Sequence, residues 1–435
     1  MKITRSIITI FCLFLVTGCA SLGPYTVNLA DPPEFFIENN INPLKNVELE
    51  NNIVSVFYAT NRVAWGEGES KYFYYKNKGG MSLNIGKANV QFGKKGTSWQ
   101  ELKDFILIKE KRPKYSLRVI DVDEFGALNF ARKRFDPKRG DPNFTQVDDR
   151  LIKEINEQLA PSRNKKILIF VHGVSVPFDD PILVAAQLSY YQGFDGVAIG
   201  FSWPTQQRVL SYLSDVEQTQ YAARYLSFLL MFLSKHTDVE QINIIAHSAG
   251  SKVLSRALTD ISLLSGVDAD RNENLRKFKI GNIVFAGGDV SRDVMGIYIE
   301  YGMIEVAKKV IIYFSSKDKA LGLSNWLWKH ERIGSLKLDE SKMEDYIVDY
   351  FKSLKQLELV NATGTPGSDK QFGHVYFLTS QWVSSDLLLF LRTNLPPEER
   401  GLILDESELF WKFPENYKTR SSFQKLKDKL KFIND

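Results

Sequence analysis

Gln241-Ile-Asn-Ile-Ile-Ala-His-Ser-Ala-Gly250 is the stretch that decides the fold of this chain. Its first half is apolar and β-branched, as in a buried strand, and apolar residues at helical spacing follow over residues 251–261. A serine between such a strand and helix is the layout of a nucleophile elbow, which presents its hydroxyl above a parallel sheet. Only very small residues fit two positions before and after that serine, and here they are Ala246 and Gly250. The pattern therefore predicts Ser248 as a nucleophile.

A serine hydroxyl needs a base to take its proton and an acid to orient that base. In this fold they follow in the order serine, acid, histidine, and of the 5 histidines only His330 and His374 come after Ser248. His374 lies between an apolar strand-like run (357–360) and a long helical pattern, where the last strand would deliver the base. His330 reads as a partly exposed helical residue. The sequence favours His374 and leaves His330 as the alternative.

The orienting acid should lie just past the carboxyl end of a strand between these positions. Residues 309–314 form such a run, and Asp318 follows closely. Asp289, after the run 283–286, is the alternative, with Asp293 behind it. Because an aspartate after a Gly-Gly pair commonly caps a helix or closes a loop, the sequence favours Asp318.

Acyl transfer also requires N–H donors aimed at the developing oxyanion. Residues 166–171 are apolar after the initial Lys166, as in a parallel strand, and a His-Gly turn follows them. We expect the N–H of Ala249 and that of Val174, or a neighbour, to be the two donors. His172 is expected to hold this loop by hydrogen bonds, without a role in proton transfer. Such a triad requires no metal and no organic cofactor.

Strand-like and helix-like runs alternate from residue 166 onward, which predicts a mostly parallel, doubly wound α/β sheet with helices on both faces. The candidate residues all fall at carboxyl ends of strands, where sites gather in such folds. The expected strands are 166–171, 196–201, 242–247, 281–286, 309–314 and 357–361, and the expected helices include 179–192, 215–235 and 251–264.

The remaining segments flank this core, which we place at residues 151–395. Residues 53–150 are expected to be a β-rich part that packs on the main sheet, with strand-like alternation at 53–60, 81–90 and 105–119. Residues 396–435 form a C-terminal extension, and its apolar stripe at 423–433 is expected to dock onto the domain.

The first residues predict the location of the protein. Lys2 and Arg5 precede a short apolar stretch, which indicates a secretory signal over residues 1–19. The stretch closes with Val16-Thr-Gly-Cys19, which resembles a bacterial lipobox and implies lipid on Cys19. Residues 20–52 are polar, proline-containing and without periodicity, so they are expected to be a tether. We expect a lipid-anchored protein of the cell envelope, at the outer membrane if the organism is Gram-negative.

The ordered motifs resemble those of bacterial alpha/beta hydrolases of the esterase/lipase superfamily, some of them lipoproteins. The matching stretches are Val56-Phe-Tyr-Ala-Thr-Asn-Arg62, Phe170-Val-His-Gly173, Gly193-Phe-Asp-Gly196, Phe201-Ser-Trp-Pro204, Ala246-His-Ser-Ala-Gly250, Ser315-Ser-Lys-Asp318 and Gly373-His374. The resemblance implies the alpha/beta-hydrolase fold, with Ser248 as nucleophile, Asp318 as acid and His374 as base. Trp203 would line the site or be structural, and His172 and His247 are further candidates for its lining.

The expected function is hydrolysis of a carboxylic ester, in a small molecule or a lipid, or a related acyl transfer. The formal net charge of +4 and the lack of a basic stripe give no reason to expect a nucleic-acid partner. The alternative is an envelope lipoprotein that keeps the hydrolase scaffold for binding only. Two features favour it: Val174-Ser-Val176, where the family commonly has Tyr-Asn-Asn, and the added C-terminal extension.

Overall fold

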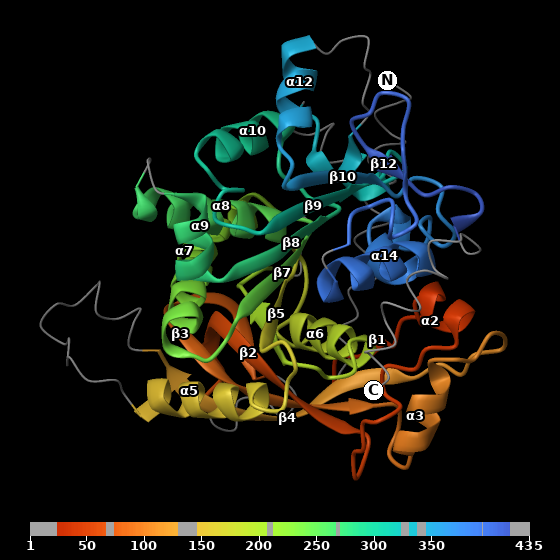
Figure 1. Cartoon of the computed structure of the whole chain (residues 1–435). Coiled ribbons are helices and arrows are strands. Elements are labelled where there is room, and N and C mark those ends of the chain that lie inside the picture. The colour runs from red at the N-terminus through yellow and green to blue at the C-terminus, as the bar shows by residue number, and fades with distance from the viewer. Residues whose placement is uncertain are drawn as a thin grey trace, which may run out of the picture.

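The computed structural model describes residues 24–66, 74–128, 146–206, 212–266, 270–322, 330–336, 345–393 and 395–417. These ranges build a 12-stranded sheet with the strand order β1-β4-β3-β2-β6-β5-β7-β8-β9-β10-β12-β11 (Figure 1). Its strands are β1 (Val27–Asn28), β2 (Ile53–Ala64), β3 (Tyr75–Phe92), β4 (Ser116–Ala127), β5 (Lys166–Val171), β6 (Val197–Ser202), β7 (Gln241–His247), β8 (Ile280–Ala286), β9 (Lys309–Phe314), β10 (Leu357–Asn361), β11 (Ile403–Leu404) and β12 (Trp411–Lys412). The α-helices are α2 (Glu34–Asn39), α3 (Trp99–Phe105), α5 (Gln146–Leu159), α6 (Asp179–Tyr191), α7 (Tyr212–His236), α8 (Gly250–Ser265), α9 (Arg271–Phe278), α10 (Arg292–Glu300), α12 (Asp345–Ser353), α13 (Tyr376–Thr379) and α14 (Gln381–Arg392).

The middle of the sheet is parallel, as predicted. Neighbouring strands from β2 through β6, β5, β7, β8 and β9 to β10 all pair in parallel. Strands β5, β9 and β10 have the predicted bounds, and β6, β7 and β8 differ by one residue. The predicted α/β fold class is therefore confirmed.

Helices cover both faces of this sheet, and β5 shows why residues 167–171 are all apolar. Ile167, Ile169 and Val171 belong to the core beneath α5, α7 and α8. Leu168 and Phe170 belong to the opposite core, beneath α6 and α14. A strand buried on both faces gains burial energy from every side chain, so its sequence is continuously apolar. Figure 1 shows the two helical layers on either side of the strands.

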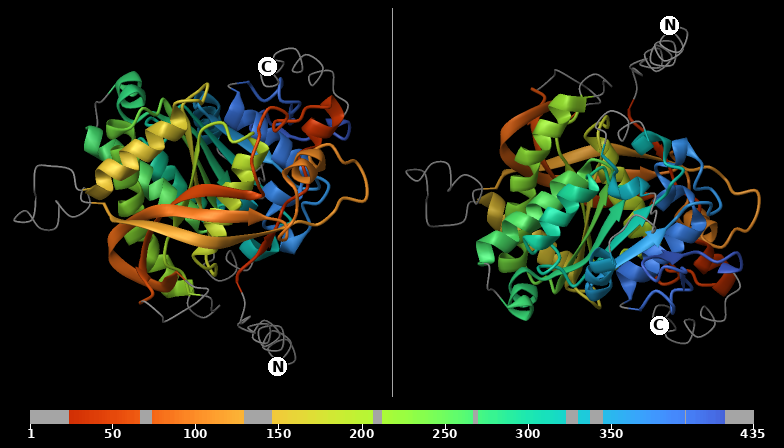
Figure 2. Two further views of the ribbon diagram at one scale, coloured as in Figure 1. Left: turned by 90° about the horizontal axis from the view of Figure 1, so that it is seen from below. Right: turned by 90° about the horizontal axis from the view of Figure 1, so that it is seen from above.

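The N-terminal strands extend the same sheet. β2, β3 and β4 pair antiparallel, and β2 joins the core by pairing in parallel with β6; these antiparallel strands lie in front when the molecule is seen from below (Figure 2, left). The strand expected over residues 105–119 is wrong for its first part, because α3 ends at Phe105 and β4 begins only at Ser116. A capping box starts α3: the Ser98 hydroxyl accepts from the N–H of Glu101, and the Glu101 carboxylate accepts from the N–H of Ser98.

The tether expected over residues 20–52 is also wrong from residue 27 onward, because Val27–Asn28 form β1 and pair with β4. Residues 34–39 form α2, and the side chains of Phe35 and Phe36 are each only 1% exposed. The N–H of Phe35 donates to the Ser385 hydroxyl on α14 at 3.0 Å. This helix is too short to show a periodic pattern in the sequence. It can be recognised only in the structure, where it packs against α14.

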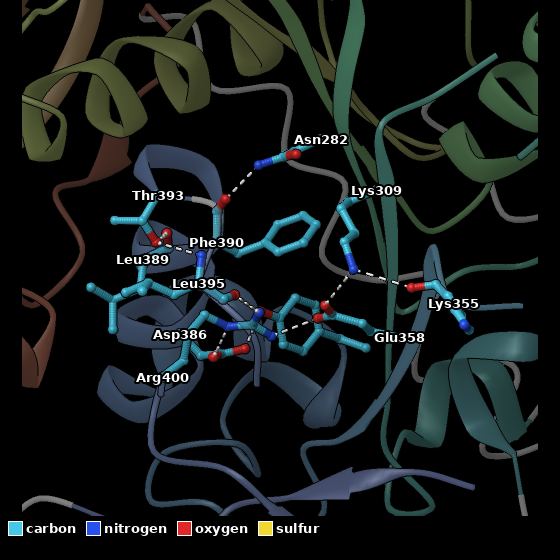
Figure 3. A network of polar contacts seen from close by, with 11 residues as sticks. Asn282, Lys309, Lys355, Glu358, Asp386, Leu389, Phe390, Thr393, Leu395 and Arg400 are labelled. Atoms are coloured by element: carbon cyan, nitrogen blue, oxygen red, sulfur yellow. Dashed lines mark hydrogen bonds and ion pairs between the residues drawn. The ribbon is translucent and has the colours of Figure 1, made fainter. Parts of the chain in front are cut away.

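The C-terminal extension adds β12 in parallel to β10, and β11 pairs with β12. Before these strands, the fully buried Arg400 binds Asp386 on α14 and Glu358 on β10 (Figure 3). The predicted stripe at 423–433 lies outside the described residues. In the ranges given above, no helix combines the length and apolar character needed to cross a membrane.

Candidate active site

Ser248 lies in the sharp turn between β7 and α8, and its backbone has a φ of 54°. Left-handed backbone costs a non-glycine residue about 1–3 kcal/mol in strained sites, so neighbouring contacts must hold it. The N–H of Ser248 donates to the carbonyl of Ala286 at 3.1 Å, and its carbonyl accepts from the N–H groups of Ser251 and Asp289, each at 3.0 Å. This is the geometry predicted for a nucleophile elbow.

Gly250 allows α8 to start directly against β5. A Cβ atom at this position would lie 2.5 Å from the carbonyl oxygens of both Val171 and His172. We therefore expect Gly250→Ala to lower the free energy of unfolding by about 1–3 kcal/mol and to displace the turn at residues 172–174. Urea unfolding measures this loss. Gly296→Ala on α10 is the matched control, because nothing lies within 4 Å of its Cβ position; equal stability of the two variants would contradict the prediction.

His374 and Asp318 meet at the carboxyl ends of β9 and β10. His374 Nδ1 lies 2.7 Å from Asp318 Oδ2, and the Asp318 carboxylate is fully buried. The other carboxylate oxygen, Oδ1, accepts from the N–H of Leu321 at 3.0 Å. Because the carboxylate can only accept, Nδ1 of the neutral imidazole carries the proton and donates it. Nε2 is then the nitrogen that is able to accept a proton.

Three residues that hold His374 were not identified in these roles from the sequence. The Nε2–H of His247 donates to the carbonyl of His374 at 3.1 Å, and the two rings lie 4.7 Å apart. Burial, and then the charge of His374, lowers the pKa of His247 to about 3, so its ring stays neutral. Gly287, with a φ of 55°, leaves room for the His374 ring, since a Cβ there would lie 3.3 Å from Nδ1. The Tyr376 hydroxyl accepts from the N–H of Gly287 at 2.8 Å and fixes that turn.

A cavity of about 950 Å³ lies above the sheet edge, and Ser248 and His374 both line it. Val174 and His247 also line it, whereas Asp318 lies behind His374. Among the described residues, no hydrogen bond takes up the N–H of Val174 or the N–H of the buried Ala249. Buried N–H groups are normally paired, so these two groups remain available to an oxygen in the cavity.

His172 and Trp203 do not line the cavity, so of the two roles left open for them the structural one applies. They are 1% and 0% exposed and stack with ring centres 5.2 Å apart. The Trp203 N–H donates to His172 Nε2 at 3.0 Å, and its indole N–H donates to the His172 carbonyl at 2.7 Å. His172 Nδ1 then donates to the Gly173 carbonyl at 2.6 Å. The pair holds the loop that carries Val174, as expected for His172.

The alternative candidates make other contacts. Asp289 also lines the cavity, but its carboxylate forms ion pairs with Lys252 at 2.7 Å and with Arg332 at 3.3 Å. His330 is exposed, is not helical, and lies 3.8 Å from the exposed Asp293. Within the described ranges, no three His, Cys, Asp or Glu side chains lie close enough together to hold a metal ion.

Residues 148–391, more than half of the chain, match the family described as alpha/beta hydrolase of unknown function (DUF900). The chain belongs to this family. Solved structures similar to this alpha/beta hydrolase include a predicted CIB-like hydrolase from Thermoplasma acidophilum, with 13% identity over 54% of this chain and 88% of that chain and a TM-score of 0.29. Esterase B from Lactobacillus rhamnosis has 14% sequence identity over 54% of this chain and 76% of its own, with a TM-score of 0.30. Thermogutta terrifontis esterase 2 has 13% sequence identity over 54% of this chain and 86% of its own, with a TM-score of 0.27. No curated protein matched.

Two successive carboxyl groups lie at the start of α6 of this alpha/beta hydrolase, and one of them lines the cavity. Asp180 lines the cavity and accepts from the Tyr25 hydroxyl at 2.7 Å. Asp179 is 5% exposed. Burial raises the pKa of Asp179 to about 7 and that of Asp180 to about 6, although the nearby charge of Arg62 opposes both shifts.

Asp179→Asn is expected to become relatively more stable as the pH rises. The unfolded carboxyl loses its proton near its ordinary pKa of 3.8, while the folded one keeps it until about pH 7. Between pH 3.8 and about pH 7 the folded wild type thus binds more protons than the unfolded chain. The contribution of Asp179 to the free energy of unfolding therefore declines as the pH rises through this range. Between pH 5 and pH 7 the unfolding free energy of the variant relative to wild type should gain about 2 kcal/mol. Urea unfolding across this range measures the difference, and a constant difference would contradict the expectation.

Proposed function

We propose that this alpha/beta hydrolase cleaves carboxylic esters with Ser248 as nucleophile, His374 as base and Asp318 as the acid that orients it. The observation that carries the proposal is the 2.7 Å hydrogen bond between His374 and Asp318 at the wall of the cavity that Ser248 also lines. Each group is held from behind, by the Leu321 N–H at Asp318 and by the Ala286 carbonyl at Ser248. The rigid support favours catalysis over binding alone.

The reaction follows from these positions. Ser248 Oγ attacks the ester carbonyl carbon while His374 Nε2 takes its proton, and Asp318 stabilises the imidazolium that forms. The N–H groups of Val174 and Ala249 donate to the oxyanion of the tetrahedral intermediate. The intermediate collapses, His374 returns the proton to the departing alcohol, and Ser248 keeps the acyl group. Water, or another alcohol in an acyl transfer, then attacks the acyl-enzyme by the same route in reverse.

A fluorophosphonate probe tests this proposal, because its phosphorus reacts with an activated serine. We expect wild type to be labelled and both Ser248→Ala and His374→Ala to remain unlabelled. Ser251→Ala is the control: its hydroxyl is buried and makes no hydrogen bond to the described residues, so its loss should leave labelling intact. A folded wild type that takes up no label would refute the proposal and support a binding function. Esters of graded chain length would then define the acyl group.

We also propose that the protein is attached to the cell envelope through lipid on Cys19, at the outer membrane in a Gram-negative organism. Cys19 lies outside the described residues, and the lipobox-like sequence before it supports the proposal. Incorporation of a labelled fatty acid by the wild type, and its loss in Cys19→Ala, would test the attachment.

A further inference from the structure

The mouth of the cavity beside His374 is formed by two loops, residues 315–322 and 365–374. Their exposed charged side chains are Lys317, Lys319, Lys370 and Asp369, since Asp318 is buried. The loops touch through their backbones: a Cβ at Gly373 would lie 2.8 Å from the carbonyl oxygen of Lys317. This side of the mouth therefore carries an excess of positive charge.

An exposed aromatic residue lies on the second of these loops, two positions after Lys370. Phe372 is 61% exposed, and its backbone has a φ of 62°. Gln371 before it and Gly373 after it have φ values of 49° and 73°, so three successive residues are left-handed. A bulky residue rarely adopts this conformation. The chain thus accepts a strained backbone at a large apolar residue that is mostly exposed, two residues before His374.

The opposite side of the mouth belongs to the N-terminal segment. Residues 25–31, which include β1, line the cavity, and so does the exposed Lys114. Tyr25 is the sixth residue after Cys19, and six residues span at most about 20 Å. Lipid on Cys19, as proposed above, would therefore keep this mouth close to the membrane surface. The wall between the two sides is largely apolar, with Val27, Leu29, Phe170, Val184, Phe377 and Leu378.

We propose that Phe372 and Lys114, Lys317, Lys319 and Lys370, here called the rim, dock onto a bilayer containing anionic lipid. The substrate is then an ester lipid of that bilayer, which enters the apolar cavity directly from the membrane; this second part rests on the proposed function. Lysines near an anionic surface each contribute about fivefold to binding. An aromatic ring inserts at the level of the head groups.

Vesicle sedimentation tests the docking with a chain of residues 20–435, which cannot be lipidated. Every described element starts after residue 24, so this chain keeps the whole sheet and both cores. Carrying Ser248→Ala, it should bind vesicles of phosphatidylglycerol and phosphatidylcholine, and bind pure phosphatidylcholine much less. Lys370→Gln should lower the affinity about fivefold. Phe372→Asn should lower it several-fold, since asparagine accepts the left-handed backbone.

Two variants far from the mouth serve as matched controls. Tyr301→Asn removes a 56% exposed aromatic ring just after α10, and Lys235→Gln removes an exposed lysine at the end of α7. Both should bind like the parent chain. The docking is overturned if the parent chain does not bind, if binding ignores anionic lipid, or if the controls lose as much affinity as the rim variants.

Turnover separates the docking from the proposed function. With Ser248 restored, the ratio of vesicle-lipid hydrolysis to hydrolysis of a soluble p-nitrophenyl ester should fall about fivefold in Lys370→Gln. A chain that binds vesicles but cleaves neither ester refutes the proposed function and leaves the docking in place. A chain that cleaves the soluble ester without binding vesicles refutes the docking and leaves the proposed function in place.

Discussion

Ser248→Ala should hydrolyse esters at least about 10⁴-fold more slowly than the wild type. The substitution removes the atom that would form the acyl-enzyme, while the N–H groups of Val174 and Ala249 remain to polarise a bound ester. We expect His374→Ala to lose a comparable factor, because the base and the nucleophile act in one proton transfer. Asp318→Asn should also lose about 10⁴-fold, since the amide would no longer favour the tautomer with the proton on Nδ1.

The decisive measurement is the double variant Ser248→Ala/His374→Ala. When residues act as one unit, the effects of substituting them do not add. The kcat/KM of the double variant should therefore match that of the Ser248→Ala chain. Multiplicative losses would show that the two residues act independently and would contradict a shared proton relay. Thermal unfolding of each variant checks that the loss is not one of folding.

The parallel core and the chemical candidates could be predicted because both leave local signals. Strands buried on both faces must be continuously apolar, and β5 and β9 each contain such a run of five apolar residues after an initial lysine. Parallel strands place their carboxyl ends along one edge of the sheet. Residues that follow separate strands, such as Asp318 and His374, therefore come together although they are 56 positions apart.

The short elements and the contacts that support the candidate site leave no local signal in the sequence. Helix α2 has six residues, and β11 and β12 have two each, too few for any period to appear. The roles of His247 and Gly287 depend on where the His374 ring lies, which tertiary packing decides. His172 and Trp203 could line the site or support it from their positions in the sequence, and only the burial of their rings shows that they support it.

Arg400→Met is expected to lower the free energy of unfolding by about 3–5 kcal/mol, because it removes the cation of the buried Asp386 and leaves the buried Glu358 with Lys309, 3.9 Å away, as its described ion-pair partner. Arg400 Nε donates to Asp386 at 2.7 Å, and Nη2 donates to Glu358 at 2.7 Å. Burial alone would lower the pKa of Arg400, yet these two carboxylates raise it above its ordinary value, so the guanidinium stays charged. The network joins the C-terminal extension to α14 and to β10, the strand before the loop that carries His374 (Figure 3).

Urea unfolding compares this variant with two others. Lys352→Met breaks the exposed pair of Lys352 with Glu408, 3.1 Å apart, which also contacts the C-terminal extension; because such exposed pairs contribute little, its loss should stay within about 1 kcal/mol. The triple variant Arg400→Met/Asp386→Asn/Glu358→Gln removes the stranded charges and keeps an oxygen at residue 386 for the Tyr313 hydroxyl, which donates to Asp386 at 2.6 Å. It should recover most of the lost stability. If Arg400→Met were no less stable than Lys352→Met, the buried network would contribute nothing to holding the extension on the sheet.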